Sequence, residues 1–395
     1  MSEVANIPQL RFPGFSDEWE ERPLKDVSTF FNGKAYKQAE LLSSGKYPVL
    51  RVGNFFTNNS WYYSNLELDE NKYCDNGDLL YAWSASFGPR IWAGEKVIYH
   101  YHIWKVINHS QVTKKFLFIV LDNETAKMKA QSANGFALLH ITKGTIENWK
   151  INLPTRQEQQ KIAAFLAAVD SKIEQLSKKQ ALLGEYKKGL MQQIFTQEIR
   201  FKAGDGSDFP DWEEKKLGDV FEIKAGQSKS KHIKKDGKNI IVDMGGISSE
   251  PKLVAKKLTD YDDDFLTTND LVMPKDDIGG GLIIGKVAEI PENNKYICGD
   301  HIYKLTVVNG NITFLKYAIN SYQVNKSFRQ KANGTAQIGL SRKEVENQLL
   351  SFPSLKEQTK IANFLSSIDS KIEQVSKQLV ESKQFKKALL QQMFV

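Results

Sequence analysis

The chain contains nearly the same amphipathic helix twice. The segment "IAAFLAAVDSKIEQLSKKQ" begins at Ile162 and "IANFLSSIDSKIEQVSKQL" begins at Ile361, an offset of 199 residues. Without a gap, residues 158–195 align on residues 357–394 with identity at 21 of 38 positions. Because 395 residues suffice for two domains of ordinary size, the sequence predicts a tandem repeat of two similar halves.

The apolar residues of both copies recur at alternating steps of four and three, the spacing of a coiled-coil seam. Polar or charged residues interrupt it at 180 and 187 in the first copy and at 382 and 386 in the second. A lone rod ~50 Å long would leave its seam exposed to water, so we expect the two copies to pair. Separate surface helices, each packed on its own domain, are the alternative. The predicted helix–helix seam residues are Ile162, Leu166, Val169, Ile173, Leu176, Ile361, Leu365, Ile368, Ile372 and Val375.

The order of the segments determines how such a pair would run. Only a short stretch around "TQEIRFKAGDGSDFP" links the first helix to the second body, so the second helix has to run back antiparallel to the first. We therefore predict an α+β chain, in which two long antiparallel coiled-coil helices separate two α/β domains at opposite ends. The predicted boundaries are 1–156 and 197–355 for the domains, and 157–196 and 356–395 for the helices.

The two bodies carry short β-branched and aromatic runs typical of strands. Examples are "KYPVLRVGNF", "KVIYHYHIWKV" and "GLIIGKVAEI". An acidic and aromatic segment opens each half, and its Trp19 and Trp212 are predicted to anchor the domains.

The bulk composition narrows the class of protein. The net charge of +7 is compatible with a polyanionic partner. Cys74 and Cys298 lie far apart and outside any Cys-x-x-Cys motif, which disfavours disulfides and structural zinc. The longest apolar run, 116–121, is far shorter than a membrane span, and no signal peptide is evident, so we expect a cytoplasmic protein without membrane contact.

The candidate catalytic and metal motifs are incomplete. "GGLIIGK" at Gly280 resembles a phosphate-binding loop, but Val287 replaces the Ser or Thr that would hold magnesium. His100 and His102 are expected on one face of a strand without a third ligand. The aspartates at 262–264 and at 276–277 read as solvated turns. We expect no catalytic residue and no metal site.

For DNA contact in the first half, two loops stand out. "FNGKAYKQ" places Lys34 and Lys37 around Tyr36, a mixture of phosphate charges and a planar ring. "YAWSASFGPR" supplies Trp83, Ser84, Ser86 and Arg90. Because lysine outnumbers arginine 46 to 8, Arg51 and Arg90 are the best candidates to read guanine. A solvated basic turn is the alternative for the first loop.

In the second half, "KAGQSKSKHIKK" is the most basic stretch. Gln227 could read adenine, while lysines around it meet phosphates. Lys275 and the loop at Asn333 and Gly334 are weaker additions. The four lysines are Lys229, Lys231, Lys234 and Lys235.

Several of these segments together resemble a known family. "GDLLYAWSASFGPRIWAGEKVIYHYHIWKV", the "ANG" turn with "NLPTRQEQQKIAAFLAAVDSKIE", and the copy "FPSLKEQTKIANFLSSIDSKIE" are similar to the DNA-specificity subunit of type I restriction-modification systems. The resemblance covers essentially the whole chain. The second body departs from the first, since "MPKDDIGGGLIIG" stands there and "WSASFG" is absent, which puts its contact residues in doubt.

The resemblance implies two target-recognition domains that read a bipartite, asymmetric sequence in double-stranded DNA. It also implies that the helices are spacer and docking site for two modification subunits, which methylate adenine, and that separate restriction and motor subunits join them. S-adenosylmethionine, ATP and magnesium would bind those partners, and this chain would bind no cofactor. Two alternatives stay open: a duplicated coiled-coil scaffold without catalysis, and a self-contained DNA-modifying enzyme.

Overall fold

The computed structural model describes residues 6–56, 58–84, 87–132, 141–334 and 337–394. The chain forms two compact units, of which unit 1 comprises Met1–Ser177 with Gln378–Val395, and unit 2 comprises Lys178–Lys377. The boundaries fall inside the two long helices, because the first and second halves of each helix pack within different units.

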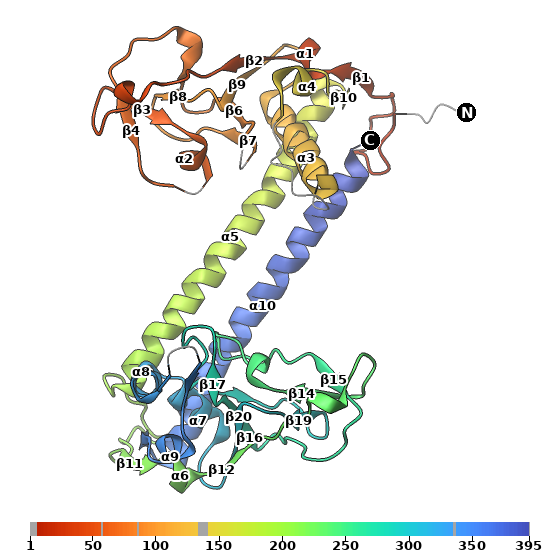
Figure 1. The fold of residues 1–395 in the computed structure, drawn as a ribbon. Helices are drawn as coiled ribbons and strands as arrows, with labels where there is room; N and C mark the ends of the chain where they lie inside the picture. The colour runs from red at the N-terminus through yellow and green to blue at the C-terminus, as the bar shows by residue number, and fades with distance from the viewer. Residues whose placement is uncertain (1–5, 57, 85–86, 133–140, 335–336, 395) are drawn as a thin grey trace. The chain divides into compact units, whose positions relative to one another are not determined.

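Unit 1 is built around two four-stranded sheets, with strand orders β2-β9-β6-β7 and β4-β3-β8-β5 (Figure 1). β3 pairs with β8 in parallel, whereas β9 pairs antiparallel with both β2 and β6. The strands are β1 (Glu20–Pro23), β2 (Ser28–Asn32), β3 (Tyr47–Leu50), β4 (Tyr62–Ser64), β5 (Tyr73–Cys74), β6 (Leu79–Ala82), β7 (Gly88–Ile91), β8 (Val97–Tyr99), β9 (Ile103–Asn108) and β10 (Lys150–Leu153). The helices are α1 (Leu24–Val27), α2 (Val52–Phe56), α3 (Lys114–Ser132), α4 (Lys143–Glu147) and α5 (Arg156–Phe195), with 3₁₀ turns at Gln38–Glu40 and Glu70–Lys72.

Unit 2 repeats the first of these sheets with the order β12-β20-β16-β18 and carries a second sheet, β13-β15-β14-β19. The strands are β11 (Glu213–Lys216), β12 (Phe221–Ala225), β13 (Ile233–Lys234), β14 (Asn239–Val242), β15 (Lys257–Thr259), β16 (Asp270–Pro274), β17 (Asp276–Asp277), β18 (Ala288–Glu289), β19 (Tyr296–Cys298), β20 (Ile302–Val307), β21 (Ile338–Gly339) and β22 (Leu349–Phe352). The helices are α6 (Leu217–Val220), α7 (Ile312–Ile319), α8 (Tyr322–Lys331), α9 (Arg342–Glu346) and α10 (Leu355–Met393), with 3₁₀ turns at Ser230–His232 and Met244–Gly246.

The core of unit 1 forms where aromatic strand residues meet α3. Phe30 and Tyr81 are fully buried with Phe116 of the helix, and removal of such large apolar surfaces from water is the main stabilising term. Trp19 is 3 % exposed and packs edge-on against Phe116 and Phe394, which confirms its predicted anchoring role. In unit 2, Trp212 is partly buried against the corresponding cluster.

Each unit contains the start of one long helix and the end of the other. In unit 1, Ile162 and Leu166 of α5 share a buried cluster with Leu389 and Met393 of α10. In unit 2, Ile361 and Leu365 of α10 share a cluster with Ile194 of α5. Because opposite ends meet in both units, the two helices run antiparallel. The first turns of each helix also pack against strands of their own unit. The alternative prediction, in which each helix packs on its own domain, therefore accounts for part of the buried surface.

Two of the predicted strand runs are strand only in part. The run 96–106 is not one strand: it breaks at His100–His102, because the chain leaves β8 in one sheet and enters β9 in the other. His100 and His102 therefore lie around a turn and not along a strand face. In "GLIIGKVAEI", only Ala288–Glu289 is strand, and residues 281–286 form a loop.

Candidate nucleic-acid interface

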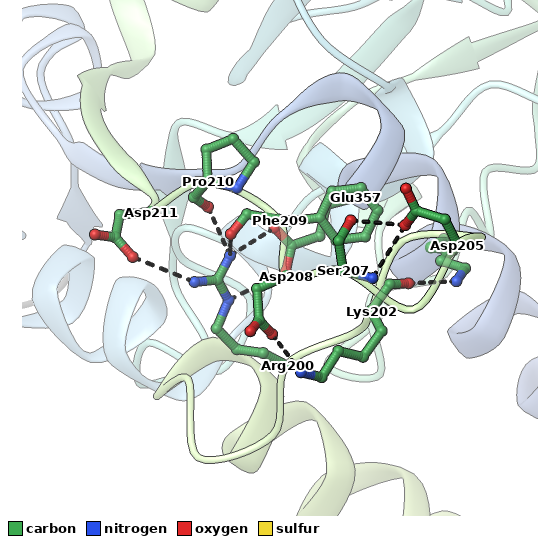
Figure 2. Close-up of polar contacts among 10 residues, drawn as sticks. Arg200, Lys202, Asp205, Ser207, Asp208, Phe209, Pro210, Asp211 and Glu357 are labelled. Carbon is green, nitrogen blue, oxygen red and sulfur yellow. Dashed lines mark hydrogen bonds and ion pairs between the residues drawn. The ribbon is translucent and has the colours of Figure 1, made fainter.

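A buried ion pair holds the first turn of each long helix. In unit 1, Arg11 donates from Nε and Nη2 to the two carboxylate oxygens of Glu158, at 2.7 and 2.8 Å. In unit 2, Arg200 makes the equivalent bonds to Glu357 at 3.3 and 3.0 Å, and it also donates to the carbonyl oxygens of Phe209 and Pro210 (Figure 2). Both glutamates are fully buried.

The two arginines have a structural role that the sequence alone did not reveal. Each stands in a short repeated motif, "LRF" at Leu10 and "IRF" at Ile199, which could have revealed them. The phenylalanines of these motifs also correspond, since Phe12 packs edge-on against Phe165, and Phe201 packs against Phe364. The segment before each body is thus fastened to the helix that follows that body.

The glutamine after each buried glutamate satisfies backbone groups at the same place. Gln159 donates to the carbonyl oxygens of Gln111 and Pro154 and accepts the Thr113 N–H at 2.8 Å. Gln358 likewise donates to Pro353 and accepts the Asn311 N–H. Buried backbone groups need such partners, so the Glu-Gln pair of the repeated motif is a structural joint.

The charged interruptions of the heptad pattern form ion pairs between the helices. In unit 1, Lys386 of α10 lies 2.6 Å from Asp170 of α5, and in unit 2, Lys187 of α5 lies 2.6 Å from Asp369 of α10. The aspartates belong to the two copies of "DSKIEQ". Tyr317 also donates to Asp369 at 2.6 Å, and burial raises the pKa of that tyrosine. A charged residue at a seam position helps to specify helix register and orientation.

The predicted seam residues lie on the inner faces of the helices. Most are buried, and Val169, Ile173 and Ile372 are partly buried. The buried ones are Ile162, Leu166, Leu176, Ile361, Leu365, Ile368 and Val375.

The first predicted DNA loop in unit 1 is held by its own contacts. Lys34 pairs with Glu40 at 3.3 Å, and its ammonium lies 5.6 Å from the Tyr36 ring centroid. Tyr36 is half-buried and stacks on His100, and burial raises the pKa of its hydroxyl. Lys37 is exposed. DNA contact by these three residues stays a prediction, with Lys37 the most accessible.

The two predicted arginine readers of unit 1 both lie over aromatic rings. The Arg51 guanidinium is 4.3 Å from the Tyr62 centroid and donates to the Ser60 carbonyl at 3.2 Å. Arg90 is exposed on β7 and lies 5.1 Å from the centroid of Phe56. Stacking of this kind holds a guanidinium plane while leaving donors available.

Two further candidates of the "WSAS" segment, Trp83 and Ser84, are less accessible than expected. Trp83 donates its indole N–H to the Tyr101 carbonyl at 2.7 Å and stacks on Trp104. Ser84 is buried, at 7 % exposure. Ser86 lies outside the described residues. His100, whose ring packs against Tyr101 and His102, has its pKa lowered to about 4 by burial, by His102 and by Arg51.

In unit 2, the basic stretch divides into buried and exposed lysines. Lys229 is only 6 % exposed, pairs with Asp264 at 3.3 Å and lies over the Tyr261 ring, so its ammonium is not presented to a phosphate in this arrangement. Lys234 is exposed and pairs with Asp260 at 2.6 Å. Gln227, Lys231 and Lys235 are exposed.

The weaker candidates of unit 2 lie near one another. Lys275 follows β16, and its backbone carbonyl accepts the Leu340 N–H. Asn333 forms a bridge with Gly339, the residue that also pairs with Asp276 of β17. Gly334 adopts φ +129°, and an added Cβ would meet the Gln337 carbonyl. These residues therefore surround the small β17–β21 pair.

Two properties of the described residues bear on other functions. The described residues include no group of three or more His, Cys, Asp and Glu side chains placed to hold a metal ion. Within the same residues, no helix has the length and apolar character needed to cross a membrane.

The repeated architecture has counterparts among known proteins. The protein-family model of the type I restriction modification DNA specificity domain matches residues 16–183 and 210–382, one match for each half. The chain belongs to this family. It carries two such domains in tandem, and the predicted α+β fold class with two recognition domains is confirmed.

Individual proteins and solved structures are also similar to this chain. The chain is 27 % identical over 404 residues to the type I restriction enzyme MjaVIII specificity subunit of Methanocaldococcus jannaschii, covering 96 % of this chain and 92 % of that one. The fold is similar to that of the type I restriction-modification S subunit from M. genitalium, with a TM-score of 0.64, 16 % identity and coverage of 98 % and 99 %. The EcoBI specificity subunit of Escherichia coli is 21 % identical over 181 residues, which are 44 % of this chain and 38 % of that one.

Family membership defines the role of the chain. It is a DNA-recognition component of a type I restriction-modification system, it assembles with other subunits of that system, and it is not the catalyst.

Proposed function

We propose that this protein reads a bipartite, asymmetric sequence in double-stranded DNA, one half-site through each unit. The observation that carries the proposal is the pair of specificity-domain matches, each with the same four-stranded sheet order but with different connecting loops. After β6 the first unit has "WSASF", whereas after β16 the second has "KDDIGGGLIIGKV". Since loops on a shared scaffold supply recognition, different loops would read different bases.

Exposed basic side chains would supply the sequence-independent part of binding. Lys37 in unit 1 and Lys231 and Lys235 in unit 2 are exposed and available to phosphates. Arg51 and Arg90 are the residues proposed to read bases in unit 1, because stacking on aromatic rings orients their guanidinium groups for paired hydrogen bonds to guanine.

We further propose that two modification subunits dock on the long helices. Tyr186 of α5 is 56 % exposed and Phe385 of α10 is 53 % exposed, and these aromatic residues occupy equivalent positions of the repeat. Tyr186 also lines a surface hollow with Gly189, Leu190 and Gln193. Exposed aromatic residues are typical anchors of protein interfaces, and two copies of one patch suit two copies of one partner.

The cofactors of the reaction would bind those partners and not this chain. The segment resembling a phosphate-binding loop supports this assignment, because Gly285 packs directly against Phe328 and Val287 is fully buried. S-adenosylmethionine, ATP and magnesium are therefore assigned to the modification and the restriction or motor subunits, with the assembled complex acting in the cytoplasm.

The test is reconstitution with the cognate modification subunits, followed by single-molecule sequencing of adenine methylation. We expect methylation at one split sequence. Methylation at scattered, unrelated sites would contradict the proposal, and methyl transfer or cleavage by the isolated chain would favour the self-contained enzyme. A scaffold without DNA readout would show no salt-dependent, sequence-selective binding.

A further inference from the structure

The loop between β16 and β18 occupies a defined place in the repeat. In unit 1, β6 pairs with β9 on one side and with β7 on the other. In unit 2, β16 pairs in the same way with β20 and β18. Residues 275–287 therefore correspond to the loop of unit 1 that follows β6, but they are longer and rich in glycine.

This loop is closed by a buried carboxylate. Asp277, at 3 % exposure, accepts the Gly279 N–H at 2.5 Å and the Ile283 N–H at 2.8 Å. Its strand β17 pairs with β21, which fixes the base of the loop. Charge-assisted bonds to backbone N–H groups are strong, so residues 278–282 form a constrained tip.

The far side of the loop is fixed to α8. Asn325 donates to the Ile284 carbonyl at 3.1 Å. Gly285 has φ +68°, and a Cβ there would lie 2.6 Å from the Cβ of Phe328. Both the conformation and the close approach require glycine at this position.

The tip presents two aliphatic side chains to solvent. Ile278 is 68 % exposed and Leu282 is 57 % exposed, and the residues between them are Gly279, Gly280 and Gly281. Gly280 and Gly281 adopt φ of +78° and +82°. We name Ile278 and Leu282 together the apolar prong. A rigid loop that exposes aliphatic residues and lacks side chains between them lets another molecule approach its backbone closely.

One cation, Lys286, belongs to this loop, and a second, Arg329, lies near it on α8. Lys286 is half-buried, and burial lowers its pKa, with the nearby charge of Arg329 lowering it further. Neither side chain forms an ion pair within the part of the chain that the structure describes. Two neighbouring cations without a carboxylate partner favour an external anion such as a phosphate.

We propose that the apolar prong contacts the base pairs of the half-site read by unit 2, while Lys286 and Arg329 bind an adjacent phosphate. This inference rests on the proposed function. Aliphatic side chains form neither hydrogen bonds nor ion pairs with phosphate oxygens. In DNA complexes they contact thymine methyl groups or insert between base steps. The prong therefore supplies base recognition in the unit whose contact residues the sequence left in doubt.

The experiment uses the full chain with its modification subunits and the duplex target identified by methylation sequencing. We expect the double variant Ile278→Ala/Leu282→Ala to weaken binding by about tenfold or more, with an unchanged slope of log K against log salt. Its methylation map should lose base preference in one half-site and retain the other. Lys286→Met should instead reduce the magnitude of the salt slope by about 1.

The control is Val308→Ala, which truncates an aliphatic residue of unit 2 that is 64 % exposed and lies outside this loop. It should leave affinity and both half-sites unchanged, and thermal melting of all variants should match the parent protein. If the parent complex methylates no split sequence, the proposed function fails. If the parent does and the prong variant keeps its affinity and both half-sites, this inference alone is overturned.

Discussion

Replacement of Arg11 by methionine tests the joint at the start of α5. The change keeps much of the side-chain volume but removes both donors from Glu158, whose carboxylate is fully buried. Loss of one partner from a buried ion pair costs about 3–5 kcal/mol, because the remaining charge stays in a poorly solvating environment. The Arg11 side chain is 10 % exposed, so some water can reach the site, and we expect the lower end, about 3 kcal/mol.

Removal of Arg11 and Glu158 together should change the free energy of unfolding only slightly. Nη1 of Arg11 is buried without a hydrogen-bond partner, so the pair bears an uncompensated desolvation cost. The double variant Arg11→Met/Glu158→Leu should therefore recover most of the stability lost in the single variant. Arg342→Met is the control, since Arg342 forms a 2.6 Å pair with Glu346 but is 58 % exposed, and it should cost at most about 0.5 kcal/mol.

The assay is differential scanning calorimetry together with hydrogen exchange of peptides from the first turns of α5. For a unit of roughly 200 residues, about 3 kcal/mol corresponds to a decrease of about 6–12 °C in the transition of unit 1. Exchange should accelerate around Glu158. The reasoning is refuted if Arg11→Met behaves like Arg342→Met, or if the double variant is as unstable as the single one.

Three further outcomes are expected. Gly285→Ala should lower the free energy of unfolding in urea by about 2–4 kcal/mol, since it combines a strained φ with overlap on Phe328; an unchanged midpoint would contradict the geometry. His100 has a pKa of about 4 in the folded chain, so the unfolded chain binds its proton at higher pH, and stability should fall as pH decreases from about 6.5 toward 4. His100→Asn should flatten this pH dependence of the melting temperature, and an equal slope in both proteins would exclude His100 as its source. Tyr186→Ala or Phe385→Ala should each leave DNA binding by the isolated chain intact and remove one of two modification subunits in native mass spectrometry; retention of both would reject the docking site.

The repeat and the helices were predictable because both can be recognised directly in the order of the residues. An offset of 199 residues and a heptad pattern are visible in the letters, and the length of the linker dictates an antiparallel return. The pairs Lys386–Asp170 and Lys187–Asp369 were not predictable, although residues 187 and 386 were recognised as interruptions. Their partners depend on the register between two helices, which no single helix specifies.

The candidate site shows the same division. Residue type and position near a loop led to the prediction that Arg51 and Arg90 read guanine. In the structure the guanidinium groups of both lie over aromatic rings. Residue type could not show that Lys229 is buried on Asp264, because that depends on a contact between segments far apart in the chain. Ile278, which we propose as a DNA contact, was not selected from the sequence because an aliphatic residue is expected inside, whereas this one is exposed.

Periodicity, duplication and chain length can be read from the order of the residues, and they are sufficient to define two domains of one kind and a pair of antiparallel helices. Burial decided which cations are exposed, which glutamates need arginine and which loop exposes Ile278 and Leu282. These outcomes depend on solvent access and on distances between atoms, and both exist only once the sheets and helices have packed.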